Sequence, residues 1–308
     1  MNLSKPWRQL CSSIIVQLGI TLFFLPASIA KSLSFHGDGL YNESSQERCA
    51  ETIRIAQKTL IKMCGNGANK LESRENPVPC ESTNVTTVRG PGGVGETALI
   101  NFLSSRGFLT NDKDNFDRVK HSPFRANNGR SKGFHGVNSG SCPNEPGLYL
   151  YGDPVASVFS LYRRNYAIRQ YARLNQKHMG GPLPANASEY VRNGTDIWFQ
   201  YKKHMTLWLR HCPNILAMTL TDMVDPGMLS LIAYHLNIPS SRIEGFNIAP
   251  RASPTTSDFD LPFYTKLYRD LQKVASRRRC QIGMLPKRGP RGMGPRPHGL
   301  SAANYIGE

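Results

Sequence analysis

Acidic residues are scarce in this chain of 308 residues: 22 aspartates and glutamates stand against 38 lysines and arginines, which gives a formal net charge of +16. An imbalance of this sign favours polyanionic partners such as glycosaminoglycans, phospholipid head groups or nucleic acid, and composition does not choose among them. The basic excess is concentrated toward the C-terminus, at Arg277, Arg278, Arg279, Lys287, Arg288, Arg291 and Arg296.

Cysteine pairs at metal-binding spacing are also missing. No two cysteines stand in a C-x-x-C arrangement, which argues against a zinc site. The cysteines that follow the N-terminal segment form an even number, as suits an oxidising lumen: Cys49, Cys64, Cys80, Cys142, Cys212 and Cys280. The sequence does not give their connectivity, although Cys49, Cys64 and Cys80 are near enough in the chain for two of them to pair.

One long apolar run stands at the N-terminus. Lys5 and Arg8 precede it, and it ends in Pro26 and the small residues "ASIA". This pattern predicts a secretory signal with Ala30 as the last residue of the leader. The alternative is an uncleaved signal-anchor, since residues 10–25 are just long enough to cross a membrane. Acceptor sequons support entry into the secretory pathway, at Asn42, Asn84, Asn186 and Asn193.

The chain divides into four predicted segments. Residues 1–30 form the leader or anchor, and residues 31–82 form a polar stem or N-terminal cap with one helix over 44–64. Residues 83–282 form an α/β domain. Residues 283–308 are a basic disordered tail, too rich in glycine, proline and arginine to pack.

Strands alternate with helices in the α/β segment, which implies βαβ units around a mainly parallel sheet. Hydrophobic patterning predicts strands over 84–89, 116–123, 148–151 and 214–220. It predicts helices over 95–107, 155–174, 195–212, 225–238 and 261–278. Trp198 and Trp208 lie on the same predicted helix and are expected to pack in the protein core. Asp222 and Asp225 are expected to cap the helix that follows them.

The stretch "VRGPGGVGETALINFL", residues 88–103, lacks a lysine where a nucleotide-triphosphatase loop would carry one. Gly90, Gly95, Glu96 and Thr97 fit the pattern G-x-x-x-x-G-K-[ST] except at the lysine. Inward backbone amides and the helix dipole favour an anion there. A glutamate would repel that anion by roughly 4 kcal/mol at about 4 Å. Glu96 must therefore point away, or the site has lost its ligand, and ATP or GTP hydrolysis is disfavoured.

A second cluster follows in "LYLYGDPVASVFSLYRR". Asp153 and Pro154 form a turn from a strand into a helix, and Ser160, Arg163 and Arg164 then lie within about one helical turn. A hydroxyl and two guanidinium groups so placed can bind a phosphate. The alternative is a solvated basic helix face.

Together the two clusters resemble the sulfotransferases that use 3'-phosphoadenosine 5'-phosphosulfate. That family has a phosphate loop, and some sixty residues later a strand leading into R-[ND]-P-x-[DE]-x-x-x-S, matched here by Asp153, Pro154 and Ser160. "VKHSP", residues 119–123, is similar to the family's second strand. Residues 204–239 resemble its later helix, strand, acidic turn and helix ending in "L-x-I-P". The resemblance covers residues 83–282.

The resemblance implies a P-loop-type three-layer sandwich with a central, mainly parallel sheet. It places the 5'-phosphosulfate on the loop residues Gly92, Gly93, Val94, Gly95, Glu96 and Thr97. Ser160, with Arg163 or Arg164, would hold the 3'-phosphate. Arg251 falls where the family often has a basic residue near that phosphate, although a surface arginine is the alternative. His121 is the implied base, and no metal is required.

Three departures from the family are visible. Gly93 replaces the basic residue that would neutralise the transferring sulfonate, Gly152 replaces an arginine, and Ala156 replaces an acidic residue. Arg163 or Arg164 could substitute for the lost arginine. Lys120 could replace the loop cation in the folded chain.

Three functions are left open by the sequence. The first is a sulfotransferase of the secretory pathway, either in the Golgi lumen or secreted, that acts on a carbohydrate or glycoprotein hydroxyl. Its basic tail would bind polyanions, it would contact the membrane through an uncleaved anchor, and no nucleic-acid partner is expected. The second is a catalytically inactive binding protein for polyanionic glycans. The third is a P-loop nucleotide kinase or hydrolase.

Overall fold

The computed structural model describes residues 43–64, 85–125, 140–174, 181–247 and 253–284. The predicted leader, most of the stem, Cys80, Arg251 and the tail beyond residue 284 lie outside these residues. No helix within them is long and apolar enough to cross a membrane.

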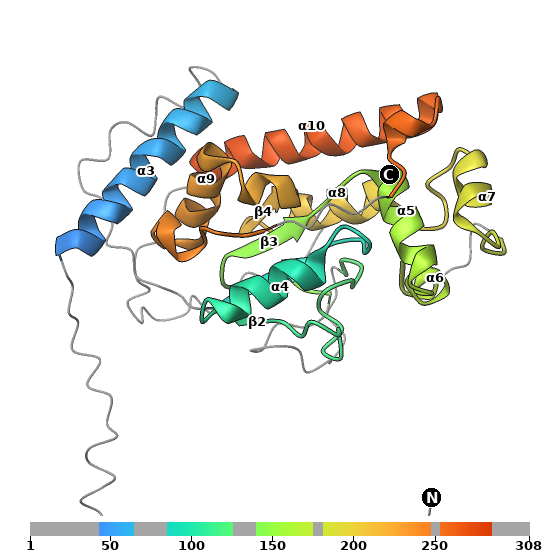
Figure 1. Cartoon of the computed structure of the whole chain (residues 1–308), viewed down its shortest axis with the longest axis horizontal. Helices are drawn as coiled ribbons and strands as arrows, with labels where there is room; N and C mark the ends of the chain where they lie inside the picture. The colour runs from blue at the N-terminus through green and yellow to red at the C-terminus, as the bar shows by residue number, and fades with distance from the viewer. Residues whose placement is uncertain (1–42, 65–84, 126–139, 175–180, 248–252, 285–308) are drawn as a thin grey trace, which may run out of the picture. The chain divides into compact units, whose positions relative to one another are not determined.

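Four parallel strands form the central sheet, in the order β2-β1-β3-β4 (Figure 1). They are β1 (Val85–Arg89), β2 (Leu109–Thr110), β3 (Gly147–Leu150) and β4 (Ile215–Met218). Every residue of β3 and β4 is buried, as expected for parallel strands covered on both faces. The chain is therefore a mixed α/β protein, as the alternation of patterns predicted.

Helices cover both faces of the sheet, with α4 and α10 on opposite sides of β3 (Figure 1). Leu148 and Leu150 of β3 pack with α4 and α9, whereas Tyr149 packs with α8 and α10. This alternation follows from the two-residue period of a strand. The α-helices are α3 (Glu43–Cys64), α4 (Glu96–Ser105), α5 (Pro154–Arg163), α6 (Ala167–Leu174), α7 (Ala187–Arg192), α8 (Tyr201–His211), α9 (Pro226–Leu236) and α10 (Pro262–Met284).

Side-chain caps explain where several helices begin. The Asp153 carboxylate accepts from the Ala156 amide at 2.9 Å and starts α5, and Asp225 accepts from Met228 at 2.7 Å and starts α9. In both helices a proline occupies the first turn, where its missing N–H costs nothing. The predicted cap at Asp225 is confirmed. Asp222 instead caps a 3-10 helix, Leu220–Met223.

Two predicted elements differ from the observed ones. Residues 116–123 form turns rather than a strand, because the Asp112 and Asp117 carboxylates accept backbone amides there and Asn115 and Arg118 have positive φ. The predicted helix over 155–174 is broken into α5 and α6 at Asn165, whose φ is 56°. The predicted helix over 195–212 begins only at Tyr201, and α7 precedes it.

Two disulfides link distant segments. Cys64 of α3 pairs with Cys280 of α10, and Cys142 before β3 pairs with Cys212 after α8. Cys64 thus finds a partner 216 residues away rather than beside it in the chain. The pairs are compatible with a secreted or lumenal protein.

Arg278 and Arg279 do not belong to a solvated basic segment. Both are buried, and their Nε atoms donate to the carbonyls of Ile215 and Ala217, at 2.9 and 3.0 Å. Arg279 also pairs with Asp222 at 2.5 Å. Because β4 is an edge strand, the two arginines satisfy carbonyls that would otherwise be left unpaired. They are therefore unavailable to a polyanion.

Loss of the Cys142–Cys212 disulfide should destabilise the domain. The bridge closes a separation of 70 residues, so the double change to serine should lower the free energy of unfolding by about 2–5 kcal/mol. Guanidinium denaturation of the oxidised protein measures this. Two reduced samples are the controls. If reduction lowers the free energy of unfolding of the wild type by the same amount, and does not lower that of the variant further, the effect belongs to this bridge rather than to Cys64–Cys280.

Candidate functional site

The carboxyl ends of β1, β3 and β4 meet at one edge of the sheet, and a pocket of about 370 Å³ opens there. This is where open parallel sheets place their ligands. Three successive loops line the pocket, together with two aromatic side chains from later in the chain. The lining includes Gly93, Val94 and Gly95 after β1, Tyr151, Gly152 and Asp153 after β3, Thr219, Leu220 and Thr221 after β4, and Phe246 and Tyr268.

The glycine loop after β1 is tightly packed. Gly93 has φ of 83° and Gly95 has φ of 100°, which favour glycine. A Cβ atom on Gly93 would lie 2.5 Å from the carbonyl oxygen of Ser157 in α5. A side chain at position 93 would therefore collide with the α5 backbone. This packing explains why the basic residue expected from the resemblance is absent.

The Glu96 carboxylate points into the loop rather than away from it. Its Oε1 accepts from the Gly92 amide at 2.8 Å, and the residue is only 3% exposed. Burial raises the pKa of Glu96, while the Lys120 charge and hydrogen bonds from backbone amides oppose that rise. The chain's own carboxylate thus occupies part of the loop. Among the described residues, nothing accepts from the amides of Gly93, Val94 and Gly95.

Lys120 lies against the start of α4. Its Nζ donates to Thr97 Oγ1 at 3.0 Å and to the carbonyl of Lys113. Burial lowers the pKa of Lys120, and the Glu96 charge partly restores it. The tertiary structure therefore brings an ammonium group to the loop from a segment 23 residues further along the chain.

His121 lies beside the same loop. Its Nδ1 is 3.2 Å from the Gly90 carbonyl oxygen and 3.5 Å from Glu96 Oε1. Since a carbonyl only accepts, Nδ1 carries the hydrogen and Nε2 keeps the lone pair. Burial, followed by the Lys120 charge, lowers the pKa of His121 to about 3, so the ring is neutral at neutral pH.

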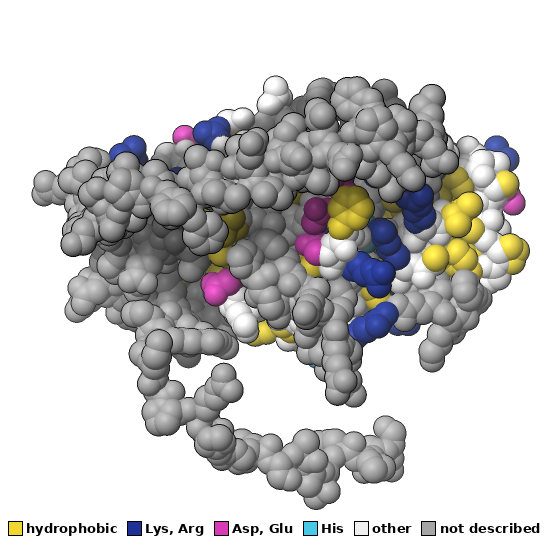
Figure 2. All heavy atoms as spheres, turned by 90° about the horizontal axis from the view of Figure 1, so that it is seen from below, with side chains coloured by type: hydrophobic (Ala, Val, Ile, Leu, Met, Phe, Trp, Pro, Cys, Tyr) yellow, Lys and Arg dark blue, Asp and Glu magenta, His cyan; other side chains and the backbone are white. Residues whose placement is uncertain are grey.

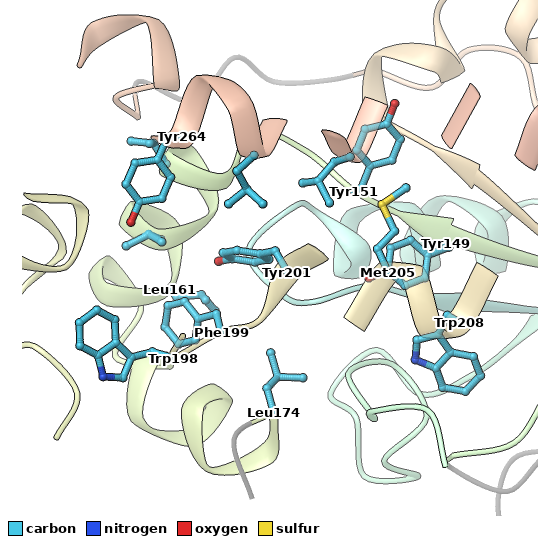
Figure 3. Packing of buried hydrophobic residues seen from close by; sticks show 14 of the residues in the cluster. Tyr149, Tyr151, Leu161, Leu174, Trp198, Phe199, Tyr201, Met205, Trp208 and Tyr264 are labelled. Atoms are coloured by element: carbon cyan, nitrogen blue, oxygen red, sulfur yellow. The ribbon is translucent and has the colours of Figure 1, made fainter. Parts of the chain in front are cut away.

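A buried network holds the segment that carries Lys120 and His121, and no sequence motif predicted it. Arg89 at the end of β1 lies 4.0 Å from the ring centre of Trp208 and donates to the Val119 carbonyl at 3.0 Å. The Ser122 carbonyl accepts from Trp208 Nε1 and from His204 Nε2, each at 2.9 Å. Figure 3 shows the core around Trp208. Trp208 and Trp198 are both buried, as predicted.

Of the three residues of the second cluster, Arg163 makes its contact away from the other two. Ser160 is buried, and its hydroxyl has no hydrogen-bond partner in the described part of the chain. Arg164 Nε donates to the Ser160 carbonyl at 3.1 Å, and the Arg164 charge acts on Glu96 and His121. Arg163 instead donates to Ser253 Oγ at 3.3 Å. Arg164 is thus the arginine on the side of the loop.

Gln170 ties α6 to the loop. Its Nε2 donates to the Pro91 carbonyl at 2.5 Å, and a Cβ atom on Gly92 would lie 3.1 Å from its side chain. This buried contact was not predicted, because it joins residues 79 positions apart.

No group of three or more histidines, cysteines or acidic residues that could hold a metal ion occurs within the described ranges. Comparison with models of protein families, with curated proteins and with solved structures finds no match.

Protonation of His204 should contribute to acid unfolding. Burial lowers its pKa from 6.5 to about 3, so between these values the unfolded chain binds a proton that the folded chain does not. His204 therefore adds stability that is fully present above pH 6.5 and is lost as the pH falls toward 3. His204→Gln should reduce the slope of unfolding free energy against pH in this range by up to about 1.4 kcal/mol per pH unit.

Urea denaturation at several pH values between 4 and 7 measures the slope. The same substitution at His211, which is exposed, is the control for the chemical change. An unchanged slope in the His204 variant would contradict the prediction, even if its stability at pH 7 were lower.

Proposed function

We propose that this domain binds 3'-phosphoadenosine 5'-phosphosulfate at the carboxyl edge of its sheet and transfers the sulfonate to a hydroxyl of a carbohydrate or protein acceptor. The observation that carries the proposal is the Lys120 ammonium, 3.0 Å from Thr97 Oγ1 in the first turn of α4. It supplies a cation beside a loop whose Gly93 has no room for one. The sequence resemblance supplies the identity of the nucleotide.

The pocket offers complementary chemistry for such a nucleotide. Gly93, Val94 and Gly95 line the pocket, and within the described residues no group accepts from their amides, so these amides would bind phosphate oxygens with the help of the α4 dipole. The rings of Tyr151 and Tyr268 offer apolar faces to a base or ribose. Ser160 and Arg164 are not among the residues that line this pocket. In the proposed complex they would hold the 3'-phosphate, and the scheme requires no metal.

Transfer would follow the in-line scheme of phosphoryl groups. The acceptor oxygen attacks sulfur, the bond from sulfur to the bridging phosphate oxygen breaks, and His121 Nε2 takes the hydroxyl proton. The burial that lowers the pKa of this ring to about 3 opposes the proton transfer. Lys120 and the loop amides stabilise the leaving phosphate. Because Glu96 lies 3.5 Å from His121 Nδ1, its carboxylate would stabilise the imidazolium that forms.

A second candidate function is a glycan-binding protein without catalysis. The inward Glu96 carboxylate favours it, because this group already accepts the Gly92 amide and would repel a phosphate placed nearby. The two candidates differ in whether the nucleotide binds.

Titration with 3'-phosphoadenosine 5'-phosphate should show micromolar binding to the purified protein. Ser160→Ala and Arg164→Glu should each weaken nucleotide binding by about tenfold or more, because each removes one buried or charge-assisted hydrogen bond. Arg192→Glu, at an exposed position on α7, is the charge control. Absence of both heat and thermal stabilisation at millimolar nucleotide would exclude the transferase and leave the binding protein.

Glu96→Gln should separate binding from turnover. Removing the carboxylate charge should tighten nucleotide binding by about tenfold, since a like charge beside the phosphates is lost. It should lower the rate of sulfonate transfer, because the imidazolium loses its counter-charge. Calorimetry and transfer of labelled sulfonate to a glycan measure the two effects. Weaker nucleotide binding in a folded variant would contradict this role of Glu96.

A further inference from the structure

Arginines from two segments converge beside the glycine loop. Arg169 and Arg173 lie one turn apart on α6, and Arg118 lies in the turn that follows β2. All three are exposed. Partial burial, followed by the charges of Arg169 and Arg118, lowers the pKa of Arg173, so the three guanidinium groups interact electrostatically. Figure 2 shows lysine and arginine side chains gathered on one face of the molecule.

These three arginines have no counter-charge in the described part of the chain. None of them forms an ion pair there, and the nearby Asp117 carboxylate is engaged by the amides of Val119 and Asp112. Like charges held together without a partner repel one another, and a bound anion removes that cost. Their arrangement therefore favours a ligand with several negative charges.

The arginine face borders the candidate site. Gln170 lies between Arg169 and Arg173 in sequence and anchors α6 to the Pro91 carbonyl of the loop. The charges of Arg173 and Arg164 both act on His121. An anion that spans these arginines would therefore reach the side of the loop on which His121 lies.

Two exposed aromatic residues lie close to these arginines in the chain. Phe116, two residues before Arg118, is 84% exposed, and Tyr166 is 47% exposed. The Arg164 guanidinium lies 5.6 Å from the ring centre of Tyr166. Ring faces stack against the C–H faces of sugars, and guanidinium forks pair with sulfate or carboxylate groups. The combination suits an anionic sugar chain.

We propose that the arginine face, formed by Arg118, Arg164, Arg169 and Arg173, binds a sulfated or carboxylated glycan chain and presents one of its hydroxyls to His121. As an assignment of the acceptor, this rests on the proposed function. A glycan is favoured over nucleic acid or lipid because the disulfides suit a lumenal or extracellular compartment and the exposed rings suit sugars.

The test uses the full chain and immobilised heparin, with the double variant Arg169→Glu/Arg173→Glu. The matched control is Lys273→Glu/Arg277→Glu on α10, an exposed pair at the same helical spacing with the same change in net charge. We expect the α6 variant to bind heparin at least about tenfold more weakly than the control, since two charge-assisted contacts become repulsive. Thermal melts check that both variants fold.

Equal loss of heparin affinity in the two double variants would overturn the proposal, because net charge alone would explain it. Retained heparin affinity with lost binding to phosphatidylserine vesicles would also overturn it, in favour of a lipid surface. Titration with 3'-phosphoadenosine 5'-phosphate on the same variants separates the two proposals. If the α6 variant binds heparin more weakly than the control but neither protein binds the nucleotide, the result would support glycan binding by the arginine face and reject sulfonate transfer.

Discussion

The buried Arg89 guanidinium is the contact on which the candidate site depends. It lies on the Trp208 ring, donates to the Val119 carbonyl, and joins the end of β1 to the segment that carries Lys120 and His121. Burial lowers the pKa of Arg89 to about 9, because the charged form loses hydration there. The carbonyls and the aromatic face offset that cost. The Gly90 amide, which donates to the Lys120 carbonyl at 3.0 Å, adds a second tie between the loop and residues 119–122, which form turns.

Packing around the glycine loop determines which charged side chains can lie beside it. Because Gly93 lies against the α5 backbone and Gly95 against Leu220, neither position has room for a side chain. A cation reaches the loop instead from Lys120 on a neighbouring segment, and Glu96 turns inward to accept the Gly92 amide. A glutamate that looked incompatible with an anion site is placed where it can act on His121 instead.

Elements with strong local patterns were predicted well. The strands over 85–89, 147–150 and 215–218 have short apolar patterns bounded by turn residues, and α4, α9 and α10 follow helical patterns. The strand predicted over 116–123 was wrong, because aspartate side chains accept the backbone amides of Phe116 and Val119, which are then not free for a strand ladder. The break between α5 and α6 was also not predicted, since it depends on the αL conformation of Asn165.

By itself, the sequence determined the alternation of strands and helices, the glycine loop before α4, and the helix starts at Asp153 and Asp225. These depend on residues close together in the chain, through period, backbone freedom and capping. Only the tertiary structure decided that Cys64 meets Cys280, that Lys120 reaches Thr97, and that Arg278 and Arg279 are buried against β4. Each of these contacts joins distant segments, and parallel sheet topology, which local patterns leave open, decides which segments become neighbours.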